Sequence, residues 1–408
     1  MLASILITSA LSFKVLVQSA GLFVVATFIF DAIHFALHQC LKSRHRWLRN
    51  LGRPHQAHHT FFDRRLKYHQ EAAVRNLLHH VIPEYVTQML VCGLAFAVMG
   101  QLPVIIVMAG FTTLFAGVMM LGGKDAHHIP FRVIPVARES LFVGAAYHVM
   151  HHTYPDSYLS SHTTLFDGLM GTACQIAGRR VALTGASGAF GSAMKELLER
   201  AGARVVTLKF GVDWTYEDYS GADAALEGVD ILVLAHGAKG QQAMQANCDS
   251  FLTLIGRFRR LTGTRQVPPE VWAIGSEIEV HPTFRNPGLS SYARSKRAFA
   301  RATAGLQRDP DILYRHIVAS AFCSRMGGGL MTGRTAATIA LWLIRRGFRY
   351  IPVTYTGIAF VNFVPYFLRG LRARQEAPRR ERFSSVPFRA RELPTHRGVQ
   401  ARDEKYAA

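Results

Sequence analysis

Two long apolar runs in the first third of the chain limit its fold more than any other feature. The first, "LVQSAGLFVVATFIF", leads into a group of histidines, and the second covers residues 85–121, with Gly100, Gln101 and Pro103 near its middle. A membrane-spanning helix needs about 20 apolar residues. We therefore expect one span at residues 15–33 and a tight hairpin of two spans at 85–121, within an α-helical membrane domain of about three to four spans.

The topology of these spans decides which polar segments meet. The first apolar run continues into histidines without a clear cleavage site, so a retained helix is favoured over a removed signal peptide. Whether residues 1–13 form a further pass is open, because Lys14 interrupts the run. Since a hairpin returns to its starting side, residues 41–80 and 123–172 are predicted to share one membrane face. Basic segments such as "KSRHRWLR" and "DRRLK" make that face cytoplasmic.

The charge of the chain points to an anionic partner. Its formal net charge is +20, which favours either an anionic membrane surface or nucleic acid. We expect the lipid bilayer and no nucleic acid, because no pattern of interleaved aromatic and basic residues is present. The five cysteines show no paired spacing, which indicates a reducing compartment without structural disulfides.

Histidines gather between and after the apolar runs. Fifteen of the nineteen lie in the first 172 residues, and they include one H-x-x-x-H motif and two H-x-x-H-H motifs. Residues i, i+3 and i+4 share one face of a helix, so each motif offers imidazoles to one side. Neutral imidazole is a good ligand for iron, zinc or copper, and the number of ligands predicts two ions. The predicted ligands are His34, His38, His55, His58, His59, His148, His151 and His152, with His127 or His128 as a further one.

Isolated histidines have a simpler interpretation. We read His69, His79, His80 and His281 as ordinary polar residues of loops, because a lone histidine is usually that. The three motifs differ, since all are predicted on one face of the membrane. Carboxylates nearby could orient the imidazoles, and the candidates are Asp31, Asp156 and Asp167.

The three motifs, together with "LFDGLMGT" at residues 165–172, resemble the fatty acid hydroxylase/sterol desaturase superfamily. The resemblance covers residues 1–172, and "AHHIP" stands where that family often has one more ligand, for which we take His128 while His127 stays open. It implies a membrane helix bundle with two histidine-bound iron ions that activate O₂. It also implies a membrane lipid as substrate and an external electron donor.

A second kind of pattern begins near residue 176. "GRRVALTGASGAFGSAMKELLERAGARVVTLKFG" reads as strand, glycine loop, amphipathic helix and strand, the opening of an α/β domain with a parallel sheet. The glycines allow a tight turn and close approach of a pyrophosphate to the helix N-terminus. This loop resembles the short-chain dehydrogenase/reductase family, which implies a Rossmann-type fold and a nicotinamide cofactor. The residues expected at the cofactor are Gly185, Ser187, Gly188 and Gly191.

The same resemblance implies a set of catalytic residues. "YARSK" carries Tyr292 and Lys296, which match the family's acid/base tyrosine and its lysine, while Ser276 matches the serine that holds the substrate oxygen. Asn247 matches the helix asparagine. Lys209 stands at the end of the second strand, where a cation favours the 2′-phosphate of NADP over NAD.

Two segments depart from that family, which leaves the activity of this domain open. The usual Asn-Asn-Ala-Gly is "LAHG" here, and "SAFCS" replaces Pro-Gly after a later strand. A degenerate, non-catalytic Rossmann domain is the alternative. Residues 351–408 read as an apolar, interfacial stretch with a basic, disordered tail, or equally as a final strand and helix with a solvated tail.

The whole chain resembles bacterial fusions described as sterol desaturase/short-chain dehydrogenase. We expect a membrane domain at 1–175, an NADP-binding domain at 176–350 and the interfacial segment at 351–408, in an integral membrane protein with the histidine clusters and the Rossmann domain on the cytoplasmic face. The implied function is a diiron, O₂-dependent lipid hydroxylase or desaturase joined to an NAD(P)-dependent dehydrogenase. Alternatives are aldehyde processing, as in plant wax-synthesis proteins that release alkanes, and a non-catalytic membrane scaffold.

Overall fold

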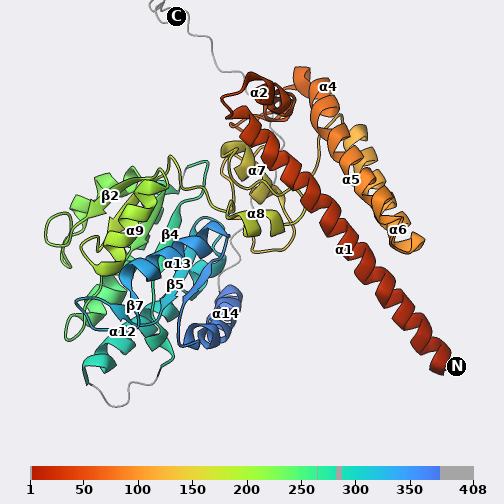
Figure 1. Cartoon of the computed structure of the whole chain (residues 1–408). Helices are drawn as coiled ribbons and strands as arrows, with labels where there is room; N and C mark the ends of the chain where they lie inside the picture. Colours follow the sequence, from red (N-terminus) through yellow and green to blue (C-terminus); the bar gives the residue numbers. More distant parts are fainter. Residues whose placement is uncertain (1, 264, 282–286, 377–408) are drawn as a thin grey trace, which may run out of the picture.

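The computed structural model describes residues 2–263, 265–281 and 287–376, as a helical half followed by an α/β half (Figure 1). Helix α1 (Leu2–Leu41) is continuous for 40 residues. At 1.5 Å per residue it is about 60 Å long, twice the roughly 30 Å of a bilayer's hydrocarbon core. Lys14 does not break it, so residues 2–13 extend the first helix and do not form a separate pass.

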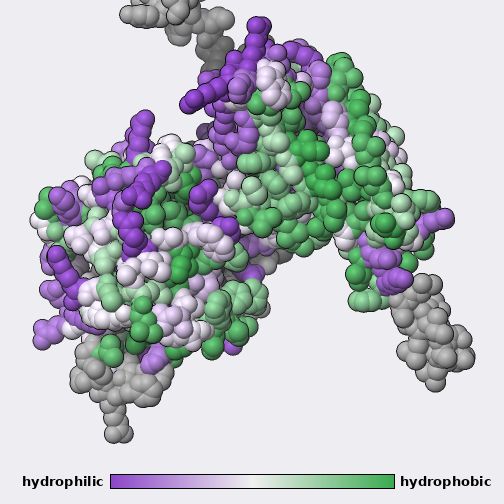
Figure 2. Space-filling view, viewed as in Figure 1, coloured by the Kyte–Doolittle hydropathy of each residue, from purple (hydrophilic) through white to green (hydrophobic). Residues whose placement is uncertain are grey.

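A helical hairpin packs against α1. It consists of α5 (Ile82–Ala95) and α6 (Gln101–Met120), and Gly100 stands at the N-cap of α6. Two segments, Ser12–Leu41 and α6, are long and apolar enough to cross a membrane, whereas α5 has only 14 residues. Figure 2 shows hydrophobic side chains covering this hairpin and α1. These features support membrane association, and the number of spans stays a prediction.

Short helices surround the C-terminal end of α1, and two of them, α3 and α7, carry five of the clustered histidines. They are separated by tight turns, and His55 ends the 3₁₀ turn Arg53–His55 that leads into α3. Their bounds are α2 (Arg46–Gly52), α3 (Gln56–Phe61), α4 (Ala73–Asn76), α7 (Ala145–Thr153) and α8 (Leu165–Met170).

The α/β half contains a six-stranded parallel sheet in the order β2-β1-β3-β4-β5-β8. The order reverses between β1 and β3, and ligands of such sheets bind at the carboxyl ends of the strands beside this reversal. This confirms the predicted Rossmann-type fold. The strands are β1 (Arg180–Thr184), β2 (Arg204–Leu208), β3 (Ile231–Leu234), β4 (Glu270–Ile274), β5 (Leu313–Ala319) and β8 (Tyr350–Val353), with β6 (Phe322–Cys323) and β7 (Met331–Thr332) paired separately.

Alternate residues of the strands point to opposite sides of the sheet, so both faces carry apolar side chains. Helices cover both faces. Val181 and Val233 face a core closed by α9 (Ala189–Arg200) and α13 (Gly333–Arg345). Ala182 and Leu232 face the other core. That core is covered by α10 (Asp223–Glu227), α11 (Ser250–Thr262) and α12 (Pro287–Ala302).

The last elements belong to the α/β half. Strand β8 is an edge strand of the sheet, and α14 (Ile358–Glu376) packs its Ala359 and Tyr366 beside it. The expected final strand and helix are therefore present, although one side of α14 is apolar and exposed. The predicted basic tail lies outside the described residues beyond 376.

Candidate metal centre and nucleotide site

Nine buried or nearly buried histidines meet at the C-terminal end of α1. Their ligand atoms form two groups, each with all members within 4.8 Å of one another. The five-histidine group contains His34, His38, His55, His59 and His151. The four-histidine group contains His58, His128, His148 and His152. All nine are residues for which the sequence predicts a metal-binding role, and of the two histidines left open it is His128 that joins a group.

In each H-x-x-H-H motif, the first and third histidines join one group and the second histidine joins the other. His55 and His59, four residues apart, join the five-histidine group, while His58 between them joins the other. In the later motif His148 and His152 stay together and His151 crosses over. At 100° per residue, positions i and i+4 are only about 40° apart, whereas i+3 lies about 60° to the other side of i. Each motif therefore contributes to both groups.

The nitrogen spacing fits metal ligation. In the five-histidine group, His38 Nε2 lies 3.2 Å from His34 Nε2, 3.2 Å from His55 Nε2 and 3.3 Å from His59 Nε2. In the other group, His128 Nε2 lies 3.4, 3.1 and 3.1 Å from the Nε2 atoms of its three partners. Ligands about 2.1 Å from an ion are separated by roughly 3.0–3.4 Å in octahedral or tetrahedral geometry. One neutral imidazole has a single N–H and cannot satisfy three such neighbours by hydrogen bonding.

The opposite ring nitrogens explain why Nε2 faces inward. Five Nδ1 atoms lie 2.7–3.1 Å from an oxygen acceptor, so each is the N–H that donates and leaves Nε2 with a free lone pair. His151 Nε2 is buried with no hydrogen-bond partner, as expected of a ligand atom. The five pairs are His34–Leu159 O, His58–Asn76 Oδ1, His128–Asp125 Oδ1, His151–Ser157 O and His152–Phe62 O.

A histidine binds a metal through its neutral imidazole, and burial favours that state in four of the clustered histidines. Desolvation lowers the pKa of His55, His58, His148 and His152 well below the usual value, and neighbouring histidines add to the effect. The donor set of neutral imidazoles therefore fits one ion in each group. Imidazole alone does not select iron over zinc.

Two carboxylates hold the loop that orients the rings. Asp31 accepts the Ser161 N–H at 2.9 Å and also its hydroxyl. Asp167 accepts the backbone N–H groups of Leu159 and Ser160 at 2.9 and 2.8 Å. Because this loop supplies the carbonyl acceptors of His34 and His151, both aspartates act on the imidazoles through the backbone. The suggestion for Asp156 is wrong, since its carboxylate pairs with Lys42 at the surface at 2.7 Å.

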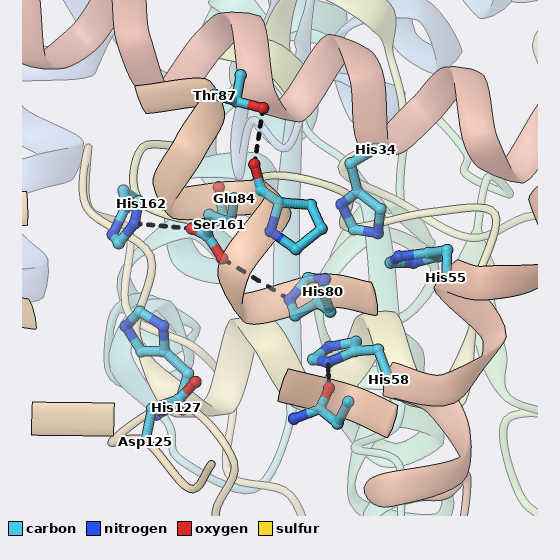
Figure 3. A network of polar contacts seen from close by, with 12 residues as sticks. His34, His55, His58, His80, Glu84, Thr87, Asp125, His127, Ser161 and His162 are labelled. Carbon is cyan, nitrogen blue, oxygen red and sulfur yellow. Dashed lines mark hydrogen bonds and ion pairs between the residues drawn. The ribbon is translucent and has the colours of Figure 1, made fainter. Parts of the chain in front are cut away.

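His80 is not the ordinary loop histidine that the sequence suggests. Its ring stacks on that of His58 with centroids 3.7 Å apart, and its Nε2 lies 3.7 Å from Glu84. Figure 3 shows His80 beside His58, with Glu84 between His80 and His162. No sequence motif includes His80, because it reaches the cluster through the packing of a separate π-helical turn, Leu77–Val81.

The glycine loop lies at the carboxyl end of β1. Gly185 has φ +68°, and a Cβ there would lie 2.6 Å from the Ala235 backbone. A Cβ on Gly191 would lie 2.1 Å from the Gly185 carbonyl oxygen, so only glycine fits. Gly188 caps α9, Ser187 is exposed beside it, and the exposed Lys209 directly follows β2. The loop therefore has the backbone shape of a pyrophosphate cradle, with Lys209 at the strand where the ribose would lie.

The four predicted catalytic residues line one cavity of about 410 Å³ at the carboxyl ends of β3, β4 and β5. Lys296 Nζ donates to the Ile274 carbonyl at 2.6 Å, and burial lowers the pKa of Lys296 to about 8. Burial raises the pKa of Tyr292 to about 12, against the opposing effect of a hydrogen bond with Ser276. Asn247 Nδ2 donates to the Ala238 carbonyl at 2.7 Å and holds the loop after β3.

The segment "LAHG" has its own polar anchors. His236 Nδ1 lies 2.7 Å from Thr184 Oγ1 on β1, and His236 Nε2 lies 2.9 Å from Ser250 Oγ on α11. The histidine thus joins β1, β3 and α11, in a segment where the sequence lacks the family's asparagines. Sequence patterns do not predict this role of His236, because its partners Ser250 and Thr184 are 14 and 52 residues away.

The histidine groups and the cavity lie at opposite ends of the parallel strands. The helical half contacts segments that precede the strands: Ile134 N donates to Gln266 O at 2.8 Å, and Ala173 N donates to Arg345 O at 2.9 Å. The cavity lies at the carboxyl ends. A five-residue strand is about 16 Å long. A hydride on a nicotinamide in the cavity could not reach the histidines directly, since reacting atoms must approach to about 3–3.5 Å.

Comparison with known proteins gives relatives for part of the chain. No protein-family model matches it. Over 251 residues it is 28% identical to "Monoglucosyldiacylglycerol epimerase" of Synechocystis sp., a match that covers 54% of this chain and 60% of that protein. The chain therefore matches less than two thirds of this relative's length.

Solved structures of short-chain dehydrogenases resemble the α/β half. One from Burkholderia cenocepacia with NADP has 16% identity and a TM-score of 0.41, covering 50% of this chain and all of that one. One from Burkholderia phymatum with NAD has 16% identity and a TM-score of 0.38, covering 52% and 99%. The histidine groups of the helical half fit the motif pattern of fatty acid hydroxylases, and the strand order of the α/β half is that of a Rossmann-type fold.

Proposed function

We propose that the chain is a membrane-bound lipid oxidoreductase with two reaction centres. The helical half hydroxylates or desaturates a lipid with O₂, and the α/β half interconverts a hydroxyl and a carbonyl of a lipid with NADP or NAD. The observation that carries the proposal is the arrangement of nine histidines in two groups with Nε2 separations of 3.1–3.4 Å. A pair of bound iron ions would supply O₂ activation there, with two electrons from an external donor.

The chain's own residues prepare the first centre for this chemistry. Burial keeps His55, His58, His148 and His152 neutral, and the Nε2 atoms of the clustered histidines lie close together, so an ion would bind without a large rearrangement of the protein. Asp31 and Asp167 fix the loop that orients His34 and His151. The apolar surfaces of α1 and α6 bring the centre to acyl chains, which supports a lipid substrate. Because the loops that flank the apolar helices are rich in basic residues, we assign the histidine groups and the α/β half to the cytoplasmic face.

In the second centre three side chains surround the reacting oxygen. Tyr292 is the acid/base that exchanges a proton with the substrate oxygen, and Ser276 donates a hydrogen bond to the same oxygen. The cation of Lys296 lowers the cost of forming the Tyr292 phenolate, and it would hold the ribose of a bound cofactor. Lys209 favours NADP, because its ammonium can pair with a 2′-phosphate. All four predicted catalytic residues line one cavity, which favours an active dehydrogenase domain over a degenerate one.

A second candidate function comes from the relative whose name is monoglucosyldiacylglycerol epimerase. By analogy, the α/β half would remove a hydride from a sugar carbon of a glycolipid and return it to the other face. Such a reaction is redox-neutral, so the nicotinamide would be regenerated in each turnover. The two candidates differ in whether NADP(H) is consumed.

The test combines metal analysis with product analysis. Full-length protein purified in detergent from iron-supplied cells should contain about two iron atoms per chain, one per histidine group. The double variant His151→Ala/His152→Ala removes one ligand from each group and should lose both. Tyr292→Phe is the matched control, because it lies in the other half and should keep the iron.

Lipids from cells that express each form are then compared by mass spectrometry. A product 16 mass units heavier, or 2 lighter, that depends on His151 and His152 supports hydroxylation or desaturation. A changed sugar configuration that depends only on Tyr292 supports epimerisation. Released alkane would instead support aldehyde processing. Protein without metal in the iron-supplied preparation would contradict the oxygenase.

A further inference from the structure

Helix α14 exposes a continuous apolar surface that nothing in the described part of the chain covers. Phe360, Val361 and Val364 are 64%, 68% and 57% exposed. Phe363, Phe367 and Leu368 add to the same surface. The opposite side of the helix is fixed to the α/β half through Ala359, Asn362 and Tyr366, which are buried. Solvent exposure of this many large apolar side chains on one helix marks an interaction surface.

The helix is tied to the catalytic serine turn by two buried carboxylates. Ser276 is followed by the turn Glu277–Glu279. Glu277 Oε1 accepts the Ala359 N–H at the start of α14 at 3.1 Å. Glu279 accepts the Asn362 side-chain N–H at 3.2 Å and the Ser276 N–H at 3.0 Å. The position of α14 is therefore set by the same turn that positions Ser276.

The apolar surface of α14 leads to the mouth of the nucleotide cavity. Tyr355, Thr356 and Ile358 line that cavity immediately before the exposed residues of α14 begin. Figure 1 shows α14 on the side of the α/β half that is turned toward the helical half. A lipid that leaves a surface in contact with α14 would therefore meet the cavity next.

We propose that α14 is a bilayer-docking helix that brings the mouth of the NADP cavity to the membrane surface. The substrate of the α/β half is then a lipid taken from the bilayer. The inference rests on the proposed function, in that both place the chain in a membrane.

Charge and continuity favour a bilayer over a protein partner. Before its last residue, Glu376, α14 contains no acidic residue, and the exposed Arg372 follows the aromatic and aliphatic stretch. Aromatic and aliphatic residues flanked by arginine are the composition of interfacial helices, since arginine pairs with anionic headgroups. The segment Ser12–Leu41 and α6 already offer two apolar helices that would hold the chain at the same bilayer.

The test measures the surroundings of one α14 side chain in the full-length protein. Val364→Cys is labelled with bimane after the accessible Cys40 and Cys323 have been changed to serine. The protein is reconstituted in vesicles of phosphatidylcholine with phosphatidylglycerol. Quenching is compared between a lipid with a nitroxide on its acyl chain and aqueous iodide. Glu199→Cys, exposed on α9, is the matched control site.

We expect the label at residue 364 to be quenched at least about threefold more by the lipid nitroxide than the label at 199, and to be shielded from iodide. Val361→Asp should reverse this difference while NADPH binding, followed by cofactor fluorescence, stays unchanged. Equal access of iodide to both labels would overturn the proposal. Protection from both quenchers would also overturn it, in favour of a protein such as a second copy. Since quenching requires neither metal nor turnover, a failed oxygenase test would leave this result standing.

Discussion

The replacement Asp125→Asn tests whether His128 is a metal ligand oriented from behind. His128 Nδ1 lies 2.8 Å from Asp125 Oδ1, while its Nε2 lies 3.1–3.4 Å from the three other histidines of its group. Although burial opposes it, His128 and the backbone N–H of His127 hold the pKa of Asp125 below its usual range, so it is a carboxylate. Asparagine keeps the shape and removes the charge, which roughly halves the strength of such a hydrogen bond.

The expected loss falls on one ion only. Changes to residues that orient metal-binding histidines cost about 10–100-fold in affinity, or about 1.4–2.8 kcal/mol. Asp125 contacts no member of the five-histidine group, so the affinity of that group should stay the same. Competition with a chelator, followed by metal analysis, should therefore show two separated release steps in Asp125→Asn. Asp223→Asn is the control, because Asp223 pairs with Arg257 in the α/β half.

Two results would refute the reasoning. If Asp125→Asn releases both ions as the unchanged protein does, the contact with His128 does not orient a ligand. If both ions are weakened equally, the two groups are not separate sites.

Three further replacements test other parts of the structure. By elemental analysis, His80→Ala should keep two metal ions per chain, because the ring of His80 only stacks on His58 and belongs to neither group. His58→Ala should keep one ion, because His58 is a member of the four-histidine group. Gly191→Ala should abolish NADPH binding in a fluorescence titration, since its Cβ would lie 2.1 Å from the Gly185 carbonyl oxygen; binding within about twofold would contradict the loop geometry. Burial lowers the pKa of Lys296 to about 8 from about 10.4 in the unfolded chain, a penalty of about 3 kcal/mol at pH 7, while the hydrogen bond to the Ile274 carbonyl offsets about 1 kcal/mol of it. Lys296→Met should therefore raise the free energy of unfolding at pH 7 by about 2 kcal/mol and abolish nicotinamide-dependent turnover. The cation is therefore penalised below pH 8 and the penalty fades toward pH 10.4, so a gain in melting temperature that persists at pH 10.5 would contradict this cause.

The gathering of the histidines could be predicted from the sequence because helical spacing is local information. His55, His58 and His59 must share a helix face at i, i+3 and i+4, and the hairpin topology brings the later motif to the same side. The assignment of each histidine to an ion could not be predicted. The helical offset separates His58 and His151 from the other histidines of their motifs, but which partners they then meet depends on where the chain places α3 and α7.

Contacts between distant segments explain the remaining differences. His236 bonds Thr184 on another strand, and Glu279 pairs with His316 at 3.1 Å across 37 residues. Periodicity and spacing carry no information on such pairs. The sequence likewise left the last segment undecided between an interfacial helix and a core element. The structure combines both, because α14 packs one side on the sheet and exposes the other.

The orientation of the sheet has a consequence for how the two centres cooperate. Buried Glu270 at the start of β4 binds Arg179 and Arg315 at 3.3 and 3.4 Å, beside the helical half. Arg179 also lies over the ring of Tyr154 in the helical half, 5.4 Å from its centroid, so the amino ends of the strands lie beside that half and the cavity lies at their carboxyl ends. Under the proposed function, a product of the first centre would have to pass the whole length of the sheet to reach Tyr292 through the protein interior. If α14 docks on the bilayer, the membrane itself becomes the route between the centres, and a lipid that stays in the bilayer can visit both. A water-soluble intermediate would be lost between them, which favours lipid substrates for each half.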